Sequence, residues 1–444
     1  MSATGNGVEP EVREGATGTG VEPEIREGGV LVIGGGIAGL TAAIEAAEAG
    51  HDVYIVEQDP SLGGRVARFF KYFPKLYPPQ CGLEINFRRI KAGHRLFTVL
   101  TLAEVEGVSG SAGDYEVRVR LNPRYVLEDR CIACNACAEA CPVERPNAFN
   151  YGMDTTKAAY LQHGMAFPMK YVIDGDACVG EEACGACVAA CPTDAIDLTM
   201  APRTITLRVG SIVVATGWQP YDARKLGLLG FNESADVISN VMMERLAAPD
   251  GPTRGRITRP SDGREAKRVA FVQCAGSRDR NHLAYCSAIC CLGSLKQASY
   301  VRDQYPDSEV FVFYIDIRAP GINEDFYHRI WGDEHVTFIK GKVAKVEEDA
   351  ESGAVIVEAE DMLAGRKIQV SVDLLVLATG MQPSTAGNPI PGLDIEYDQY
   401  GFAVENRDAG IQVAGVAKRP QDVVSSTRDA TGAALKAHQI TTRR

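Results

Sequence analysis

The pattern of apolar and polar positions near the start of the chain predicts a β–α–β unit. An apolar run from Val30 to Ile33 leads into a glycine-rich turn, an alanine-rich stretch from Leu40 to Ala49, and a second apolar run from Val53 to Val56 that ends on Glu57. Short apolar runs that flank a helical stretch of this length are typical of parallel strands joined by a helix. The chain is therefore predicted to have an α/β fold.

Two later segments alternate apolar and polar residues as strands do, and they lie far apart in the sequence. The first is Tyr115 to Arg120, and the second is Thr204 to Val209, which runs into an apolar stretch ending Ala-Thr-Gly. About eighty residues separate the two segments, whereas neighbouring antiparallel strands are ordinarily joined by a short turn. We therefore predict that residues 126–200 form a module inserted into a hairpin.

The second half of the chain repeats the strand pattern of the first. Strands are predicted from Arg268 to Gln273 and from Leu374 to Gly380, and the latter repeats the Ala-Thr-Gly ending of the first half. An apolar run from Ile411 to Ala417 and a helical stretch from Asp422 to Ala437 are then expected to return to the first domain.

The turn inside the first β–α–β unit has the spacing of a dinucleotide site. Gly34, Gly36 and Gly39 form Gly-x-Gly-x-x-Gly, and Glu57 ends the second strand. Such glycines let the backbone turn tightly and approach a pyrophosphate at the helix N-terminus, and the acidic residue accepts a ribose hydroxyl. The alternative is a glycine-rich packing turn with no ligand.

The loop after Glu57 favours FAD over NAD. Gly63, Gly64 and Arg65 follow directly, and a Gly-Gly-Arg at this place resembles the second phosphate and ribose clamp of two-dinucleotide-binding-domain flavoproteins. A plain loop is the alternative. By contrast, the strand ending at Gln273 is followed by Cys274 and not by a second glycine fingerprint, so the second domain is predicted to have lost its pyridine-nucleotide site.

Composition excludes several classes of function. The 444 residues are long enough for two or three domains, and the net charge of −12 argues against nucleic acid and against direct docking on anionic lipid. No apolar run approaches the ~20 residues of a membrane span, and no signal peptide is visible. We expect a cytoplasmic protein that is peripheral to the inner membrane only through partner subunits.

The thirteen cysteines fall into groups that suggest metal ligands rather than disulfides. A bacterial-ferredoxin run, C-x2-C-x2-C-x3-C-P, begins at residue 131, and a second run with a wider first spacing begins at residue 178. In such proteins the fourth cysteine of each run ligates the other cluster. We therefore predict two [4Fe–4S] clusters, one held by Cys131, Cys134, Cys137 and Cys191, the other by Cys141, Cys178, Cys184 and Cys187. A lost or three-iron second cluster is the alternative.

A third group of cysteines matches no standard spacing. It lies where the lost nucleotide site would have faced the flavin, and its adjacent pair precedes a helical stretch. We predict a third [4Fe–4S] cluster, with a catalytic dithiol as the rival interpretation. Its ligands would be Cys274, Cys286, Cys290 and Cys291. Cys81 stands alone and is expected to be a buried free cysteine.

The predicted architecture is a Rossmann-like, thioredoxin-reductase-like flavoprotein of two dinucleotide-binding domains with an inserted ferredoxin-like α+β module. A near-identical Gly-Val-Glu-Pro-Glu repeat near the N-terminus cannot bury a core and predicts a disordered tail; docking to a partner is the alternative role. The expected divisions are a disordered acidic tail over 1–29, an FAD-binding domain in the three segments 30–125, 201–265 and 386–444, the inserted module over 126–200, and a second nucleotide-domain-like fold over 266–385.

The chain resembles the A subunit of heterodisulfide reductase, and more closely the A subunit of the quinone-interacting membrane-bound oxidoreductase of sulfur-metabolising prokaryotes. The cysteine segment and the segment around Phe149 are the most specific parts of the resemblance. The segments that carry it are 71–90, 145–172, 240–249, 271–291 and 313–320.

The resemblance implies a flavin and iron–sulfur electron-transfer subunit that is inactive alone. It implies a related flavin and iron–sulfur subunit, a quinone-reactive membrane subunit, and adenylylsulfate reductase as soluble electron partner, with menaquinone at the other end. Two alternatives stay open: a heterodisulfide-reductase-type subunit of a soluble, electron-bifurcating complex, and a self-sufficient pyridine-nucleotide oxidoreductase.

The same resemblance places further residues near the flavin. Lys296 is implied at its reactive edge, with an exposed helical lysine as the ordinary alternative. In related flavoproteins a Gly-Asp pair binds the ribityl chain, but Gly415 here is followed by valine, so Asp422 is considered as the replacement. The Ala-Thr-Gly strand ends add Thr216, Gly217 and Gly380.

Overall fold

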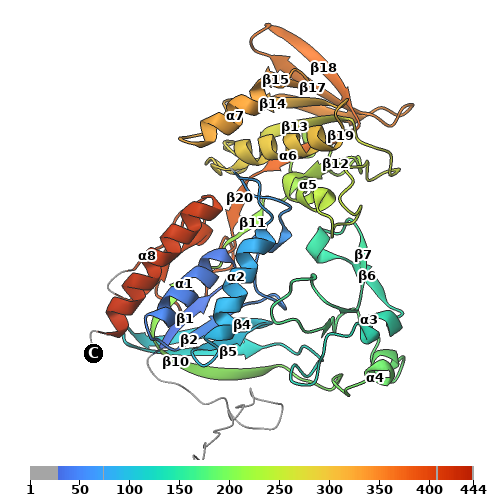
Figure 1. The fold of residues 1–444 in the computed structure, drawn as a ribbon. Coiled ribbons are helices and arrows are strands. Elements are labelled where there is room, and N and C mark those ends of the chain that lie inside the picture. The colour runs from blue at the N-terminus through green and yellow to red at the C-terminus, as the bar shows by residue number, and fades with distance from the viewer. Residues whose placement is uncertain (1–28, 74, 407–408, 443–444) are drawn as a thin grey trace, which may run out of the picture.

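A computed structural model describes residues 29–73, 75–406 and 409–442. The predicted acidic tail lies outside these residues except for Gly29. Figure 1 shows a first domain at the lower left, the inserted module at the lower right, and a second domain above them. None of the described helices is long and apolar enough to cross a membrane.

The first domain is built on a seven-stranded sheet in the order β3-β2-β1-β10-β5-β4, with β23 also paired to β10. Strands β1 and β2 are buried throughout, as parallel strands covered on both faces must be. Strand β5 alternates buried and exposed residues, since it belongs to the antiparallel region. The elements are β1 (Gly29–Ile33), α1 (Ile37–Glu48), β2 (Val53–Val56), η1 (Val66–Arg68), α2 (Pro79–Ala92), β3 (Phe97–Leu100), β4 (Ala103–Ser111), β5 (Asp114–Leu121), β10 (Arg203–Val214), β23 (Ile411–Val413), η5 (Gly415–Ala417) and α8 (Val423–Thr441).

Helices α1 and α8 lie side by side over this sheet (Figure 1). Their contact faces are rich in alanine: Ala42 and Ala46 of α1 and Ala430, Ala433 and Ala437 of α8 belong to one buried core cluster. Small side chains let two helix axes approach closely. The return of the C-terminal segment to the first sheet thereby holds the N-terminus of α8 beside the glycine turn of β1.

The inserted module leaves the sheet after β5 and returns as β10. Its two five-residue helices, α3 and α4, pack against each other. Each follows a residue in the left-handed region, Asn135 at φ 72° and Gly185 at φ 59°. The two cysteine runs therefore adopt the same local conformation. The elements are α3 (Ala136–Ala140), β6 (Glu144–Pro146), η2 (Ala148–Asn150), β7 (Thr155–Lys157), β8 (Ala159–Tyr160), β9 (Val172–Ile173) and α4 (Ala186–Ala190).

The second domain has a five-stranded parallel sheet, β12-β19-β13-β14-β15, and a three-stranded antiparallel sheet, β16-β17-β18. Two crossover strands, β11 and β20, pair with each other where the chain enters and leaves it. Its elements are β11 (Trp218–Pro220), η3 (Ala223–Lys225), η4 (Gly227–Leu229), β12 (Val237–Ser239), α5 (Asn240–Ala247), β13 (Arg268–Ala275), α6 (Cys290–Gln304), β14 (Glu309–Tyr314), α7 (Asn323–Trp331), β15 (Val336–Lys340), β16 (Val343–Glu348), β17 (Val355–Asp361), β18 (Arg366–Val372), β19 (Leu374–Thr379) and β20 (Met381–Pro383); β21 (Glu396–Tyr397) and β22 (Ala403–Val404) follow it.

The strand pairing moves one predicted boundary. Residues 201–265 were assigned to the first domain, but β12 pairs with β19, and α5 packs in the core of the second domain. The second domain therefore begins at the crossover strand β11 and not at residue 266. A three-residue strand such as β12 is too short to produce a recognisable alternation of apolar and polar residues in the sequence.

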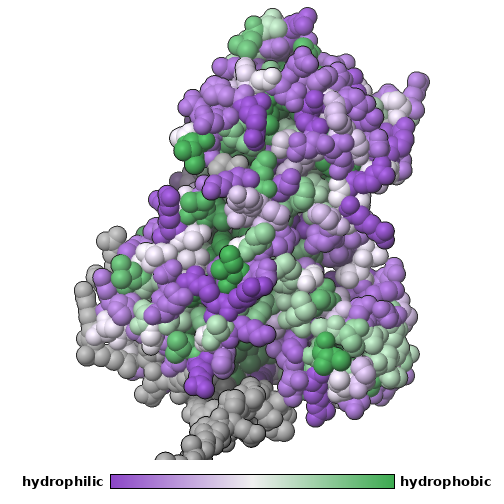
Figure 2. All heavy atoms as spheres, viewed as in Figure 1, coloured by the Kyte–Doolittle hydropathy of each residue, from purple (hydrophilic) through white to green (hydrophobic). Residues whose placement is uncertain are grey.

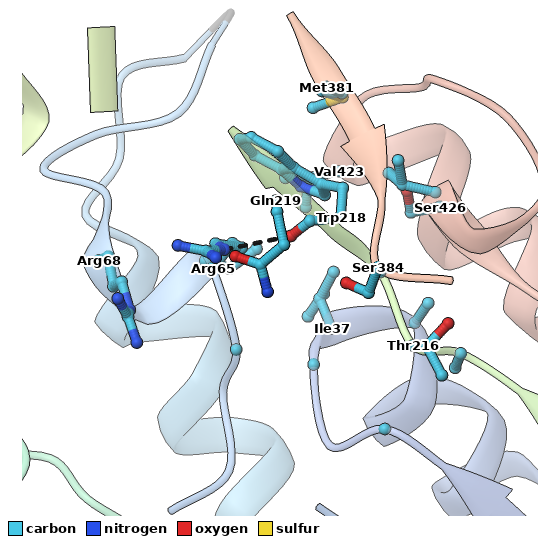
Figure 3. Close-up of a pocket in the computed structure, with 18 of the residues that line it drawn as sticks. Ile37, Arg65, Arg68, Thr216, Trp218, Gln219, Met381, Ser384, Val423 and Ser426 are labelled. Atoms are coloured by element: carbon cyan, nitrogen blue, oxygen red, sulfur yellow. Dashed lines mark hydrogen bonds between the residues drawn. The ribbon is translucent and has the colours of Figure 1, made fainter. Parts of the chain in front are cut away.

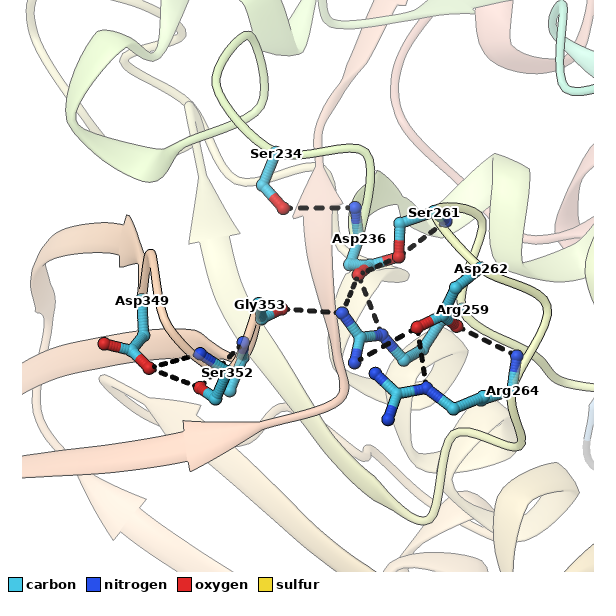
Figure 4. Close-up of polar contacts among 10 residues, drawn as sticks. Ser234, Asp236, Arg259, Ser261, Asp262, Arg264, Asp349, Ser352 and Gly353 are labelled. Atoms are coloured by element: carbon cyan, nitrogen blue, oxygen red, sulfur yellow. Dashed lines mark hydrogen bonds and ion pairs between the residues drawn. The ribbon is translucent and has the colours of Figure 1, made fainter.

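A buried ion pair ties the turn between β16 and β17 to the rest of the second domain (Figure 4). Asp236 is fully buried and accepts hydrogen bonds from Arg259 Nε at 2.9 Å and from the hydroxyl of Ser261 at 2.7 Å. Arg259 Nη2 also donates to the carbonyl oxygen of Gly353 in that turn at 2.6 Å. Each buried charge is thus paired and hydrogen-bonded, as burial requires.

Candidate functional site

A cavity of about 840 Å³ opens between the first and second domains. Its wall is formed by the β1–α1 turn, the end of β2, the loop around η1, the crossover strands, one face each of α5 and α6, and the N-terminus of α8. Figure 3 shows side chains from α1, the loop around η1, the crossover strands and the N-terminal part of α8 around one space. The volume lies near the upper end of the ~300–1,000 Å³ range of ligand pockets, which suits an extended cofactor.

The three glycines of the predicted fingerprint have distinct structural roles. Gly34 has φ +108°, and an added Cβ would lie 2.4 Å from the carbonyl oxygen of Ala215. At Gly39 an added Cβ would lie 1.8 Å from the carbonyl oxygen of Gly34, so this glycine permits close helix–strand packing. At Gly36 the one neighbour within 4 Å among the described residues would be Gly64 Cα, at 3.9 Å. Gly36 therefore keeps open a space at the N-terminus of α1, where a pyrophosphate would bind.

Glu57 is buried at the edge of the cavity. Its Oε2 accepts a hydrogen bond from the Gly35 N–H at 2.6 Å and its Oε1 from the Asp59 N–H at 2.8 Å. Burial, and then the neighbouring Asp59 carboxylate, raises the pKa of Glu57 to about 7. Each carboxylate oxygen retains a lone pair that can accept a ribose hydroxyl.

The Gly-Gly-Arg loop lies against the glycine turn. Gly63 donates its N–H to the carbonyl oxygen of Gly35 at 2.9 Å and has φ +116°, whereas Gly64 lines the cavity itself. Arg65 also lines the cavity, and its Nε donates to the carbonyl oxygen of Trp218 at 3.2 Å (Figure 3). This loop is therefore placed for the clamp role that the sequence predicts.

The remaining predicted cofactor residues divide into two groups. Thr216, Gly217 and Asp422 line the cavity, although one carboxylate oxygen of Asp422 caps α8 by accepting from the Ser425 N–H at 2.7 Å. Gly380 and Gly415 do not line it. A Cβ at Gly380 would lie 2.2 Å from Ser277 Oγ, and one at Gly415 would lie 2.7 Å from Ala38 Cβ, so close packing explains both glycines.

Lys296 lines the cavity and is buried. The alternative interpretation, an exposed lysine on a helix surface, is therefore wrong. Lys296 is 4% exposed, and its Nζ lies 2.9 Å from Glu244 Oε1, itself buried. Glu244 also accepts from Gln297 Nε2 at 2.7 Å and from the Phe70 N–H at 3.1 Å. This polar group forms the wall of the cavity that the second domain contributes.

Other cavity residues escaped the sequence interpretation. Trp218 of β11, Asn240 of α5 and Gln421 line the cavity. Gln421 is buried, and neither polar atom of its side chain has a hydrogen-bond partner in the described structure; the same holds for Thr216 Oγ1. Unpaired buried polar groups are costly and are expected to gain partners when a ligand binds. Two of the three had a signal, because Gln421 precedes the predicted Asp422 and Trp218 follows the predicted Gly217.

In the inserted module the second predicted ligand set lies together, and three members of the first set, Cys131, Cys134 and Cys137, are neighbours. Cys141, Cys178, Cys184 and Cys187 line one small cavity. In the other set, burial first, and then the neighbouring Cys131 thiol, raises the pKa of Cys137 to about 12. The fourth member, Cys191, accepts a hydrogen bond from the Ala195 N–H to its sulfur at 3.2 Å, and such bonds tune iron–sulfur clusters.

The four cysteines of the third group also lie together, around the N-terminus of α6. Burial first, and then the nearby thiols of Cys274 and Cys286 among other neighbours, raises the pKa of Cys291 to about 11. The pKa of Cys290 is raised by burial and then by the other three thiols. Cluster assembly converts such thiols into thiolates and releases protons, and a helix N-terminus favours the negative charge.

The cysteines are not paired with one another. All thirteen cysteines lie in the described stretches of the chain and none forms a disulfide. Among the described residues no three His, Cys, Asp or Glu side chains are placed to bind a single metal ion, and the ligands of a four-iron cluster stand farther apart than those of one ion. Cys81 is exposed on α2, which contradicts its expected burial.

Two family models match the chain. Residues 29–73 match FAD dependent oxidoreductase, and residues 130–195 match 4Fe-4S dicluster domain. The T. acidophilum thioredoxin reductase structure matches with a TM-score of 0.51 at 14% identity over 93% of this chain and 98% of that one, which shows the fold. The predicted fold class and the cofactors, FAD and [4Fe–4S] clusters, are thereby confirmed. The chain contains an oxidoreductase domain.

Curated relatives match nearly the whole chain. The iron-sulfur A subunit of CoB--CoM heterodisulfide reductase from Methanocaldococcus jannaschii is 40% identical over 91% of this chain and 63% of its own length. The A subunit of H(2):CoB-CoM heterodisulfide,ferredoxin reductase from Methanothermobacter marburgensis is 36% identical over 92% of this chain and 63% of its own length. The chain is similar in sequence to heterodisulfide reductase A subunits. It spans a little under two thirds of the length of each of these relatives. Neither relative's name mentions a quinone.

Proposed function

We propose that the chain is the flavin and iron–sulfur electron-transfer subunit of a complex of the heterodisulfide reductase type. The observation that carries the proposal is the placement of α6. Ile289, Gly293 and Lys296 face the cavity, while Cys290 and Cys291 on the same helix belong to the third cysteine group. A flavin in the cavity and a cluster at the cysteines would thus share one helical turn.

The residues present fit FAD. Gly36 and Gly64 leave room for the pyrophosphate at the N-terminus of α1, Glu57 accepts ribose hydroxyls, and Arg65 offers positive charge. Bound FAD would supply exchange between one-electron and two-electron chemistry. The chain itself holds the cofactor, closes the cavity with the second domain, and places inside it the Lys296–Glu244 pair, which can hold a proton.

The third cysteine group is proposed to hold a third [4Fe–4S] cluster, with Cys274, Cys286, Cys290 and Cys291 as ligands. Support comes from four mutually close, buried or half-buried thiols and from the helix N-terminus beneath two of them. Anaerobic iron and sulfide analysis tests this. Three four-iron clusters give about twelve irons per chain. About eight irons, with the module cysteines fully ligated, would leave the third group as thiols.

The second domain is proposed to bind no pyridine nucleotide. Strand β13 contains Cys274, at φ 57°, near its end, and the loop after the strand leads to the cysteine pair of α6. The segment between β13 and α6 has no Gly-x-Gly-x-x-Gly spacing to receive a pyrophosphate. We therefore expect NADH and NADPH not to reduce the flavin at a useful rate. Flavin bleaching within milliseconds of mixing with NADH would refute this and favour a self-sufficient oxidoreductase.

The inserted module is proposed to exchange electrons with a partner protein. Cys134 and Cys184 are exposed, and the apolar side chains of Ile132 and Val179, each next to a predicted ligand, are 65% and 56% exposed. Figure 2 shows apolar surface gathered over the module at the lower right. Exposed apolar surface beside redox cofactors suits a docking partner.

The partners are inferred from the relatives, which are subunits of heterodisulfide reductases. The comparisons favour an assembly of the heterodisulfide reductase type, and we propose that it is soluble and electron-bifurcating. The quinone-linked form, with menaquinone, a membrane subunit and adenylylsulfate reductase, rests on sequence segments alone. Purification of the native complex distinguishes the two. A soluble complex with heterodisulfide reductase subunits supports the first, and co-purification with a haem-bearing membrane subunit supports the second.

A further inference from the structure

One arginine is completely buried where the first domain, the second domain and the inserted module meet. Arg245 of α5 is 0% exposed, and its Nε donates to Asn150 Oδ1 of the inserted module at 2.7 Å. Its Nη1 lies 3.5 Å from the carbonyl oxygen of Arg68 in the first domain. Its Nη2 donates to the backbone and carboxylate oxygens of Asp250 at 3.2 and 3.0 Å. One guanidinium therefore contacts both domains and the module.

Burying a guanidinium is costly unless every donor finds a partner. The acceptors around Arg245 come from separate regions of the chain, so they surround it only in the assembled arrangement. The guanidinium also stacks on the ring of Phe149, with 4.7 Å from its carbon to the ring centroid. The planar fork of arginine fits such a set of acceptors, and lysine would not.

Phe149 connects this site to the wall of the cavity. The ring belongs to the buried core of the first domain, although its backbone belongs to the module. Arg68 stacks on the ring at 5.2 Å and donates to the carbonyl oxygen of Ala148 at 3.0 Å. Tyr151 lies two residues after Phe149 in the module, and its hydroxyl oxygen accepts a hydrogen bond from Arg65 Nη1 at 3.2 Å. Both Arg65 and Arg68 line the cavity.

The second domain is joined to the first through the two crossover strands and through the loop that holds Phe70, Phe73 and Leu76, whose side chains pack against the core of the second domain. β11 and β20 are three residues each and pair only with each other. Short connections of this kind are typical hinges between domains. The module segment from Asn147 to Tyr151 adds a further connection, beside the hinge but outside it.

We propose that Arg245 is a positioning residue that locks the second domain and the inserted module onto the first domain. The lock, formed with Asn150 and Phe149, fixes the separations over which electrons pass between the flavin, the module clusters and the third cysteine group. This inference rests on the proposed function. It predicts that loosening the lock slows internal electron transfer without removing a cofactor.

The test compares Arg245→Met, Asn150→Ala and the control Arg264→Met, whose guanidinium is exposed in the same domain. Flavin is photoreduced in anaerobic, cofactor-loaded protein, and the rate at which clusters gain electrons is followed. FAD content, iron content and midpoint potentials are measured on the same samples. Hydrogen exchange of α5 and of residues 147–151 gives a readout independent of the cofactors.

We expect both lock variants to slow flavin-to-cluster transfer on the order of tenfold or more, because small displacements of reacting groups have large kinetic effects. Their potentials should be unchanged, hydrogen exchange at both segments should rise, and the control should match wild type. Wild-type rates in fully loaded variants would overturn the inference. If Arg245→Met loses cofactors, Asn150→Ala decides alone. Absence of transfer in wild type would instead contradict the proposed function.

Discussion

Replacement of Gly36 by alanine should separate cofactor binding from folding. Gly36 has φ −74° and ψ −175°, which alanine adopts without strain. The described atom nearest to its added Cβ would be Gly64 Cα, at 3.9 Å. The free energy of unfolding of the apoprotein should therefore stay within about 0.5 kcal/mol of the wild-type value, as for other substitutions that disturb no contact. The methyl group would nevertheless occupy the space through which a pyrophosphate approaches the backbone.

The cost to binding follows from the bonds that would be displaced. Loss of one hydrogen bond between a backbone N–H and a charged phosphate costs about 1.5–3 kcal/mol, which corresponds to roughly 10- to 150-fold weaker binding. FAD titration of the apoprotein, followed by flavin fluorescence, measures the dissociation constant. Thermal unfolding of the apoprotein measures its stability.

Two further glycines are matched comparisons. Gly39→Ala would place its Cβ 1.8 Å from the carbonyl oxygen of Gly34 and should lower both apoprotein stability and FAD affinity. Gly432→Ala, on the exposed face of α8 with nothing within 4 Å, should leave FAD affinity unchanged. Wild-type FAD affinity in Gly36→Ala would refute the pyrophosphate assignment. So would a loss of apoprotein stability as large as that of Gly39→Ala.

Three other predictions concern charge and sulfur. The pKa of Glu57 is raised to about 7 and ribose hydroxyls favour its ionised form, so FAD affinity should increase as pH rises through about 7. The stability that this group contributes to the apoprotein should fall as pH rises from about 4.5 to about 7. Arg259→Met should destabilise the protein by about 3–5 kcal/mol in denaturant unfolding, because buried Asp236 loses its counter-charge. Cys134→Ser should remove about four irons per chain while FAD stays bound, whereas Cys81→Ser should remove none.

Each of these has a result that would contradict it. A Glu57→Gln variant that keeps the same pH dependence of FAD binding would assign the effect to another group. Arg264→Met is the control for Arg259→Met because Arg264 is exposed and pairs with the half-buried Asp262, and equal destabilisation would remove the argument from burial. Full iron content in Cys134→Ser would show that this thiol is not a ligand.

The features that sequence could predict are those in which chemistry depends on local spacing. The glycine turn, Glu57 and the two module cysteine runs are each contained in short segments, and the insertion was visible because two strands of one hairpin lay far apart. The match of the second run to the first is clear only in the structure, where Asn135 and Gly185 give both runs the same turn.

The features that sequence could not predict depend on tertiary contacts. Lys296 is buried because Glu244, on a helix fifty-two residues earlier, lies against it, and no spacing links the two. Gly380 and Gly415 resemble cofactor residues by position in related flavoproteins but pack against Ser277 and Ala38. The strand β12 is too short to leave a periodic pattern, so the domain boundary was misplaced.

The most direct test of the account is whether electrons placed on the flavin reach the clusters within one chain. The flavin of anaerobic, FAD-loaded and iron-loaded protein is photoreduced, the sample is frozen at successive times, and flavin absorption and cluster EPR signals are measured together. The account predicts that reduced-cluster signals grow as the flavin reoxidises, without any partner present. A flavin that stays reduced while all clusters stay oxidised, at potentials that favour transfer, would contradict it.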